Sequence, residues 1–402
     1  MADQDRLDVT GLFTAALRDW RRVWPQLLVM DLAYKLVAFA VLTPLFGLAL
    51  RVGVSFSGSS VLADQDILFF LLRPAGLAIM LIIAALFLAI IALEQACLMT
   101  IGVGATRVAR IGVTVALRFA LERARSVIGL TVRLIVRCLL IAVPFLAGIG
   151  AVYLLLLTDY DINYYLTEQP PAWFAALALA GLLVLGLAFL LIPRLIGWGL
   201  ALPLVLFENV TPKQALAEST RRVAGHRPPV AKVLILWGAA AFALSATAPA
   251  LVFAMGRAVG PLGRSRVGLV FALMLVILTL WALVNLLVTW LSASSFALLV
   301  VRLYERFGGG QEALEERLSS AASLQDSPAA RLTFKQLLAG LVVLAIVAGG
   351  IGFFLLDGVR NDDDVVIIAH RGASVAAPEN TMAAVDEAIA QATDYIEIDV
   401  QE

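Results

Sequence analysis

The sequence predicts a mainly α-helical protein, with a polytopic membrane helix bundle of about seven spans and a short β-α-β segment at its C-terminal end. Hydrophobic residues make up 61% of the chain and charged residues only 15%, whereas a soluble domain carries about 25% charged residues. Several apolar runs reach the roughly 18 residues that a helix needs to cross a bilayer. Only the last part of the chain, from Val365 onward, combines polar side chains with strand-like and helix-like patterns.

The charges are distributed unevenly along the chain. Its net charge is zero, but residues 1–356 hold 28 basic and 19 acidic side chains, and residues 357–402 hold 2 basic and 11 acidic ones. We therefore expect the first part to face lipid headgroups and the second to contain a cation site, with no nucleic-acid partner. Cys97 and Cys138 both lie in apolar runs, which predicts small core residues without a disulfide.

Residues 1–25 are predicted to form an amphipathic helix on the membrane surface. Apolar side chains recur there at helical spacing, with basic side chains beside them: Leu12, Phe13, Ala16, Leu17 and Trp20, and Arg18, Arg21 and Arg22. The stretch is too polar for a cleavable signal peptide.

The transmembrane domain follows over residues 26–357, and its first span covers 26–50. Asp31 and Lys35 lie four residues apart in that span, which predicts an ion pair inside the membrane.

The second span is predicted within residues 67–101, beginning after Pro74. It contains the carboxyl group of Glu94 near its far end. Two interpretations of this residue stay open, because an intramembrane carboxyl group marks either a transport or proton site, or an interfacial or paired residue.

Residues 105–137 carry polar side chains every three or four positions, with apolar residues between them: Arg107, Arg110, Thr114, Arg118, Glu122 and Arg125. This pattern predicts a helix that lies in the interface or caps the bundle. Arg133 and Arg137 extend the stripe into a third span over about 134–157, where long basic side chains can snorkel. Specific binding of anionic lipid headgroups by the stripe is the alternative.

A fourth apolar stretch runs from Trp173 to Phe207, after an acidic and tyrosine-rich loop over residues 158–172. Its 35 residues extend about 52 Å as a helix at 1.5 Å per residue, more than a hydrocarbon core of about 30 Å. Because Pro193 and Pro203 interrupt it, we expect one tilted and kinked helix, with two short spans as the alternative.

Three further spans are predicted in the second half of the chain. A polar loop over residues 208–232 precedes them and contains a short helix, capped by Thr211 with Pro212 at its first position. The spans cover about 233–255, a part of 267–301 and about 335–356, with a charged and then Ser/Ala-rich linker at 302–334. An acidic linker over residues 358–364 leads to the C-terminal segment.

Lysine and arginine gather in four segments that seven spans place on one side of the membrane: residues 1–25, 105–137, 208–232 and 302–335. The positive-inside rule therefore predicts a multi-pass protein of the cell (inner) membrane, with a cytoplasmic N-terminus and an extracytoplasmic C-terminal domain. The loop 256–266, which holds three arginines, disagrees with this arrangement. If Trp173–Phe207 crossed twice, the C-terminal domain would be cytoplasmic.

The C-terminal segment begins with a β-α pattern. Val365–Ala369 is a short, β-branched run that predicts a buried strand, and it delivers His370 and Arg371 at its C-terminal end. Asn380 or Thr381 can cap the helix that follows.

The second predicted strand, Tyr395–Val400, places Glu397 and Asp399 on one face. Two ionised carboxylates at this spacing repel each other, which predicts that one of them binds a proton or that both bind a cation. A hard, oxygen-only pair suits Mg²⁺ or Ca²⁺ better than Zn²⁺.

The polar residues of this segment form three motifs: His370-Arg371-Gly372, Glu379-Asn380-Thr381 and Glu397-Ile398-Asp399-Val400-Gln401. In this order and at these intervals, they resemble the start of a glycerophosphodiester phosphodiesterase domain. That family folds as a TIM barrel and hydrolyses glycerophosphodiesters to an alcohol and glycerol 3-phosphate, a reaction of lipid and glycerol metabolism. The membrane part resembles, more loosely, the domain that precedes this barrel in some bacterial members. The resemblance implies a metal-binding hydrolase at the lipid bilayer, whose barrel begins within residues 365–402.

The resemblance also implies a role for each motif residue. Two of them resemble catalytic groups: His370 an acid/base histidine, and Arg371 a phosphate-binding arginine. The others resemble ligands of the divalent cation, Mg²⁺ or Ca²⁺, or site-supporting residues: Glu397 and Asp399 for the cation, and Glu379 and Asn380 for support. The family also needs a second histidine and a further acidic ligand downstream, and a TIM barrel needs roughly 250 residues. Because the sequence stops at Glu402, we expect a truncated form that is inactive as given.

Two other functions compete with this one. A transporter, channel or lipid-binding membrane protein would use the intramembrane residues Glu94, Arg194 and Asn285. A phospholipase-like relative of the barrel would act on intact lipid. The sequence leaves the head group, the preferred cation and the oligomeric state open.

Overall fold

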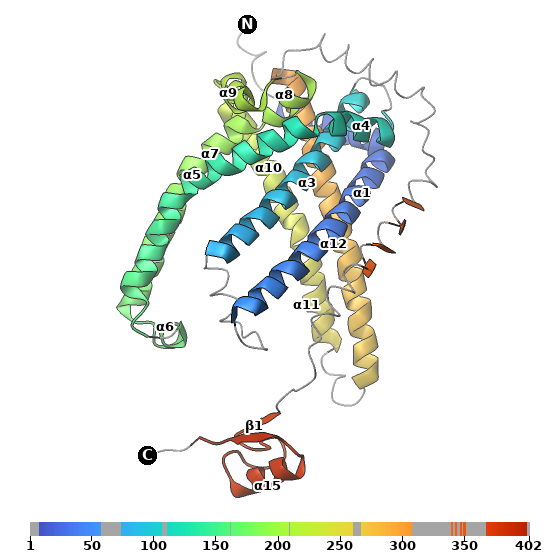
Figure 1. Ribbon diagram of the computed structural model, residues 1–402. Coiled ribbons are helices and arrows are strands. Elements are labelled where there is room, and N and C mark those ends of the chain that lie inside the picture. Colours follow the sequence, from blue (N-terminus) through green and yellow to red (C-terminus); the bar gives the residue numbers. More distant parts are fainter. Residues whose placement is uncertain are drawn as a thin grey trace.

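A computed structural model shows a bundle of long helices and a small C-terminal sheet with one helix (Figure 1). It describes residues 8–57, 74–106, 111–160, 162–208, 210–259, 267–307 and 367–399, with a few helical positions between 339 and 350. The helices are α1 (Val9–Ser57), α3 (Pro74–Thr106), α4 (Val113–Glu122), α5 (Ala124–Leu156), α6 (Ile162–Glu168), α7 (Pro171–Trp198), α8 (Ala201–Phe207), α9 (Pro212–Val223), α10 (Arg227–Ser245), α11 (Thr247–Val259), α12 (Val267–Phe307) and α15 (Met382–Ala390). The strands are β1 (Ile368–His370) and β2 (Tyr395–Glu397).

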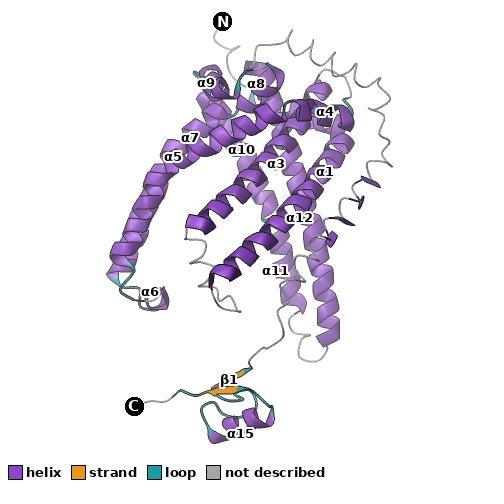
Figure 2. Cartoon of the chain, viewed as in Figure 1, coloured by secondary structure: helices purple, strands orange, loops and turns teal. Residues whose placement is uncertain are grey.

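Six helical segments of the described residues are long and apolar enough to cross a membrane: α1, α3, α5, α7 with α8, α10 with α11, and α12. Helices dominate the chain, and strands occur only in the C-terminal segment of the described part (Figure 2). The predicted fold class, a membrane helix bundle followed by a β-α-β unit, is confirmed. The seventh predicted span, over residues 335–356, lies largely outside the described residues.

Successive spans run in opposite directions, so the connecting segments alternate between the two ends of the bundle (Figure 1). α4, α8, α9 and the last turns of α12 lie together at one end, and α6 lies at the far end of the α5–α7 pair. The first group coincides with Lys- and Arg-rich parts of the chain. This end of the bundle, formed by α4, α8, α9 and the last turns of α12, is named the basic end.

α1 is continuous from Val9 to Ser57, whereas the sequence predicts a separate surface helix over residues 1–25. A proline inside a helix removes one backbone hydrogen bond and usually bends or ends it. Here buried apolar side chains lie on both sides of Pro25, among them Val23, Leu27 and Met30. Packing of these side chains against neighbouring helices stabilises α1 through the proline.

The polar stripe over residues 105–137 is divided among helices α3, α4 and α5, and no single helix carries it. Arg107 and Arg110 lie outside the described residues. The apolar face of α4 is buried in the bundle through Val115, Ala116, Phe119 and Ala120. At the turn into α5, the Arg123 guanidinium lies 3.7 Å from the centroid of the Phe119 ring. α4 therefore caps the basic end, which is one of the two arrangements that the stripe predicts.

The apolar stretch Trp173–Phe207 belongs to one crossing segment, but its break lies at Gly199-Leu200 and not at a proline. Pro193 lies inside α7. The fully buried Ser219 of α9 bonds to both sides of the break: its hydroxyl donates to Gly197 O at 2.6 Å and accepts from the N–H of Leu200 at 3.1 Å. A side chain from another helix thus satisfies two backbone groups that lose their partners at the break.

α5 and α7 form a long antiparallel pair that diverges from the other helices away from the basic end (Figure 1). Glycines bring the two helices close together. A Cβ at Gly148 would lie 3.1 Å from Leu183 Cδ1, and one at Gly186 would lie 3.0 Å from Phe145 Cε1. Exposed apolar side chains cover the outer faces of the pair, which suits contact with lipid.

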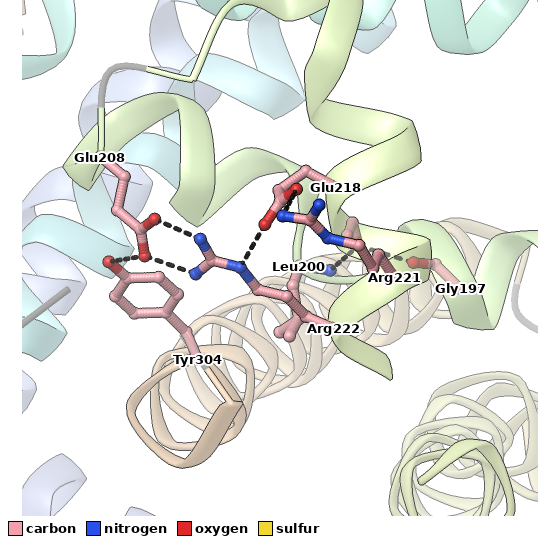
Figure 3. A network of polar contacts seen from close by, with 8 residues as sticks. Gly197, Leu200, Glu208, Glu218, Arg221, Arg222 and Tyr304 are labelled. Atoms are coloured by element: carbon pink, nitrogen blue, oxygen red, sulfur yellow. Dashed lines mark hydrogen bonds and ion pairs between the residues drawn. The ribbon is translucent and has the colours of Figure 1, made fainter. Parts of the chain in front are cut away.

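Arg222 joins α9 to the end of α8 and to α12 at the basic end (Figure 3). Its guanidinium forms a bidentate pair with Glu208, at 2.7 and 2.6 Å, and its Nε donates to Glu218 at 2.8 Å. The Tyr304 hydroxyl donates to the same Glu208 carboxylate at 3.0 Å.

The hydrogen bond from Arg222 lowers the pKa of Glu218 below its ordinary value. Glu218 therefore stabilises this end above its unfolded pKa, and the stabilisation is lost as the pH falls through the lowered value.

Arg302 makes a second junction, from α12 to α1 and α3. Its Nε lies 2.7 Å from Oδ2 of Asp19, which is fully buried. Its Nη1 lies 3.2 Å from Glu305, and the Thr106 hydroxyl donates to Glu305 at 2.5 Å. Arginine–carboxylate pairs of this kind are strong where water is excluded.

Replacement of Arg222 by glutamine should destabilise the bundle far more than the same change at Arg221. Arg222 is 21% exposed and pairs with two carboxylates from different segments, whereas Arg221 is 79% exposed and, among the described residues, pairs with Glu218. We expect a loss of about 2 kcal/mol for Arg222→Gln and less than about 0.5 kcal/mol for Arg221→Gln. Unfolding of the purified variants in detergent measures both. Equal losses would contradict the bridging role of Arg222.

Candidate active site

The C-terminal sheet brings two strand ends together. β1 and β2 are parallel, and their register pairs His370 with Glu397. The His370 Nε2 lies 3.9 Å from Glu397 Oε2, and both side chains are more than half exposed. The imidazole and the carboxylate predicted to act in one site are therefore neighbours, in reach of an ion pair when the histidine is protonated.

Asp394, which the sequence analysis does not single out, fixes the start of this sheet. Its carboxylate accepts from the N–H of Ile367 at 2.7 Å, and its own N–H donates to Ile367 O at 2.9 Å. The N–H of Tyr395 donates to the same carbonyl at 3.1 Å. The sequence signal for this role is an acidic residue just before a strand, which is common in loops as well.

Thr381 is the N-cap of α15, which decides between the two predicted caps, Asn380 and Thr381. Its hydroxyl accepts from the N–H of Ala384 at 3.3 Å and donates to Pro378 O at 2.6 Å. Ala384 and Ala388 are fully buried one turn apart on the inner face of the helix. Their small side chains let α15 lie close to the strands that it connects.

Gly372 is required by the turn that follows β1. Its φ is +78°, a conformation that residues with a side chain rarely adopt. A Cβ at this position would lie 2.7 Å from the carbonyl carbon of Ala384, and the N–H of Ala373 donates to Ala384 O at 2.9 Å. The glycine of the His-Arg-Gly motif therefore allows the turn to approach the helix backbone.

Arg371 and Asn380 have left-handed backbone conformations, with φ of 59° and 58°. Such conformations cost energy in residues with a Cβ and persist where surrounding contacts hold them. The N–H of Asn380 donates to Arg371 O at 3.0 Å, and Asn380 Oδ1 accepts from the N–H of Asp399 at 2.9 Å. Asn380 thus ties the turn after β1 to the segment after β2.

The Arg371 guanidinium lies between two carboxylates. Its Nη1 is 3.0 Å from Glu379 Oε2, and its Nε is 2.7 Å from Asp399 Oδ2. The hydrogen bond with Glu379 and the negative charge of Asp399 raise the pKa of Arg371 above its ordinary value. These two contacts hold the arginine in one orientation, and a guanidinium stays charged at any working pH.

The two predicted metal ligands lie near each other but not on one strand face, because β2 ends at Glu397 and Asp399 follows it. About half of each carboxylate side chain is exposed, so oxygens of both are open to a ligand. Two open carboxylates fit Mg²⁺ or Ca²⁺ as part of an oxygen ligand set. The described residues contain no group of three or more His, Cys, Asp or Glu side chains that could hold a metal ion.

The three residues of the transporter hypothesis do not meet in the described part of the chain. Glu94 of α3 lies against Asp31 of α1. Arg194 of α7 is exposed and donates to Leu190 O of its own helix at 2.6 Å. Asn285 of α12 is exposed as well. The helices therefore give no common polar pathway through these three side chains.

Comparison with known protein families gives two matches, which together cover most of the chain. Residues 13–348 match the family described as the membrane domain of glycerophosphoryl diester phosphodiesterase. Residues 370–402 match the glycerophosphoryl diester phosphodiesterase family, beginning at His370. No curated protein and no solved structure matches the chain.

Proposed function

Because the chain belongs to the glycerophosphoryl diester phosphodiesterase family whose members carry a membrane domain, we propose that it is a membrane-anchored phosphodiesterase. It hydrolyses glycerophosphodiesters to an alcohol and glycerol 3-phosphate. The observation that supports this proposal most is the polar cluster at the strand ends, where His370 lies opposite Glu397 and Arg371 is fixed by Glu379 and Asp399. These side chains can bind an anionic phosphodiester and move a proton, and the membrane helices keep them beside lipid-derived substrates.

Arg371 is the residue that binds the phosphate in this mechanism. A guanidinium presents its N–H groups in one plane and binds phosphate oxygens in pairs. Its contacts to Glu379 and Asp399 use Nη1 and Nε, and this proposal assigns Nη2 to a non-bridging oxygen of the phosphate. Since the two carboxylates already fix the plane of the guanidinium, substrate binding requires little further ordering.

His370 is the residue that moves a proton. An imidazole exchanges protons near neutral pH, so it can take a proton from an attacking hydroxyl or give one to the leaving oxygen. Glu397 lies 3.9 Å from Nε2 and stabilises the positive charge that appears when the ring is protonated. By resemblance to the family, the glycerol hydroxyl of the substrate attacks phosphorus first, and a second histidine completes the acid/base pair.

Glu397 and Asp399 hold a divalent cation in this proposal. When bound, Mg²⁺ or Ca²⁺ neutralises negative charge on the phosphate and acts as a Lewis acid. The open carboxylate oxygens support this assignment, and Asn380 positions Asp399 through its backbone N–H.

The catalytic domain is extracytoplasmic in this proposal. Six alternating spans of the described residues return the chain to the basic end, and the further span that the sequence predicts over residues 335–356 would take it to the other side. The basic end faces the cytoplasm by the positive-inside rule.

Substitution of His370 by alanine in the full-length protein should lower the hydrolysis of glycerophosphocholine by about a hundredfold or more, because proton transfer in the transition state is lost. The chain holds one other histidine, His226, which precedes α10, and His226→Ala should keep its activity. Release of choline from the soluble substrate is measured, with bilayer phospholipid assayed in parallel. Unchanged turnover in His370→Ala would remove this residue from the mechanism, and turnover of the bilayer lipid alone would change the substrate class.

The double substitution Glu397→Gln with Asp399→Asn should abolish the response of the enzyme to added Mg²⁺ or Ca²⁺, since amides lack the charge that a hard cation requires. Activity after chelation and stepwise return of each cation gives the measurement, and calorimetric titration of the same cations gives binding without turnover. Asp386→Asn, on the exposed face of α15, is the matched control and should respond as the parent does. Cation binding that survives the double substitution would place the site elsewhere.

A reporter fused after Arg360 tests the sidedness. Alkaline phosphatase at this position should be active and a fluorescent protein dark, because the chain has crossed to the extracytoplasmic side. A fluorescent fusion with inactive phosphatase would put the catalytic domain in the cytoplasm.

A further inference from the structure

Three ionisable side chains meet inside the membrane part, where α1 and α3 lie side by side (Figure 1). Asp31 of α1 is fully buried, and its Oδ2 forms the predicted ion pair with Lys35 one turn later. The Glu94 carboxyl group of α3 lies close enough to the Asp31 carboxyl group for the two to interact, and each has a buried oxygen, Glu94 Oε1 and Asp31 Oδ1. The cluster therefore contains two carboxyl groups and one ammonium group.

The charges of this cluster do not balance if both acids are ionised. Lys35 is 30% exposed and neutralises one carboxylate, Asp31. A second carboxylate in the apolar interior would remain uncompensated, which is strongly unfavourable. One bound proton removes this excess charge.

The geometry also calls for a proton. Two carboxylates are both acceptors, so a hydrogen bond between them exists only when one carries a proton. Asp31 Oδ1 and Glu94 Oε1 are both buried, and neither has a hydrogen-bond partner among the residues that the structure describes. A proton shared between the two carboxyl groups satisfies both oxygens.

Among the residues that the structure describes, the contacts around this cluster include no second cation. The Tyr34 hydroxyl of α1 lies 3.4 Å from the Cys97 sulfur of α3, so these two neutral groups satisfy each other beside Glu94. Gln95 turns to α12 and donates to Ala293 O at 3.4 Å. On α12, the charged group that reaches α1 is Arg302, and it is engaged by Asp19 nearer the basic end.

We propose that Asp31 and Glu94 form a proton-binding site of the membrane domain, with Lys35 as its fixed counter-charge. The ligand is a single proton, held between two carboxyl groups in the contact of α1 with α3. Loss of this proton leaves two carboxylates opposed in an apolar interface, and the contact weakens. This site lies in the membrane domain, has no part in the proposed hydrolysis and gives that domain a role besides anchoring.

Dicyclohexylcarbodiimide, an apolar reagent that adds to protonated carboxyl groups, tests the proposal on the whole chain in lipid nanodiscs. Mass spectrometry should locate the adduct at Glu94 or Asp31, with labelling that falls by about tenfold per pH unit once the proton is lost. Glu122, a carboxylate of α4 that is 51% exposed and paired with Arg118, is the internal control and should stay unlabelled at neutral pH. Absence of label from both Glu94 and Asp31 in acidic buffer would overturn the proposal, and this test requires no variant.

Two variants distinguish a proton shared by Asp31 and Glu94 from a proton held by one buried carboxyl group alone. In Asp31→Asn, Glu94 becomes the counter-ion of Lys35, ionises, and should lose its label. In Glu94→Gln, the amide donates to Asp31 without a titrating proton.

A group that holds its proton more firmly in the folded state stabilises the fold at low pH and loses this effect as the pH rises. The melting temperature of the parent should therefore fall with rising pH in the range where its label disappears, and that of Glu94→Gln should not. Labelling of Glu94 that persists in Asp31→Asn, or an identical pH response in both proteins, would contradict the shared proton.

Discussion

Pairing of buried charge and hydrogen-bonding groups determines how the helices of the membrane part fit together. Lipid tails are as apolar as leucine side chains, so apolar contact alone does not fix which helix faces meet. α12 provides the fixed points, because Arg302 bonds to Asp19 and Tyr304 bonds to Glu208, which Arg222 of α9 also binds. Deeper in the bundle, the indole N–H of Trp20 donates to Ser294 and that of Trp237 to Ser295, each at 3.0 Å. One helix thereby sets the positions of α1, α8, α9 and α10.

The spans could be predicted from the sequence because the thickness of the hydrocarbon core sets a minimum length for an apolar run that crosses it. The places where helices break could not. Pro25 predicts an end that packing around Val23 and Leu27 overrides. The actual break, at Gly199-Leu200, depends on Ser219 from a helix that follows it in the chain. Local proline content and tertiary hydrogen bonds compete at such positions, and a single sequence displays only the first.

The part of the candidate site that could be predicted from the sequence consists of the residues at the C-terminal ends of the two strands. Parallel strands in register bring His370 and Glu397 together without further information. The contacts of Arg371 with Glu379 and Asp399 depend on left-handed backbone conformations at Arg371 and Asn380. The local sequence does not predict these conformations, because neither residue is a glycine. These turns convert three separate motifs into one bonded cluster.

The α5–α7 pair is long compared with the region where it is attached to the rest of the bundle. α7 has 28 residues and is about 42 Å long, and it is attached to the compact end of the bundle where Gly199-Leu200 interrupts the helix. A rotation of about 5° at this joint displaces α6 by roughly 4 Å at the opposite membrane face. Any small rotation among α8 and α9 would therefore be magnified along the length of the α5–α7 pair.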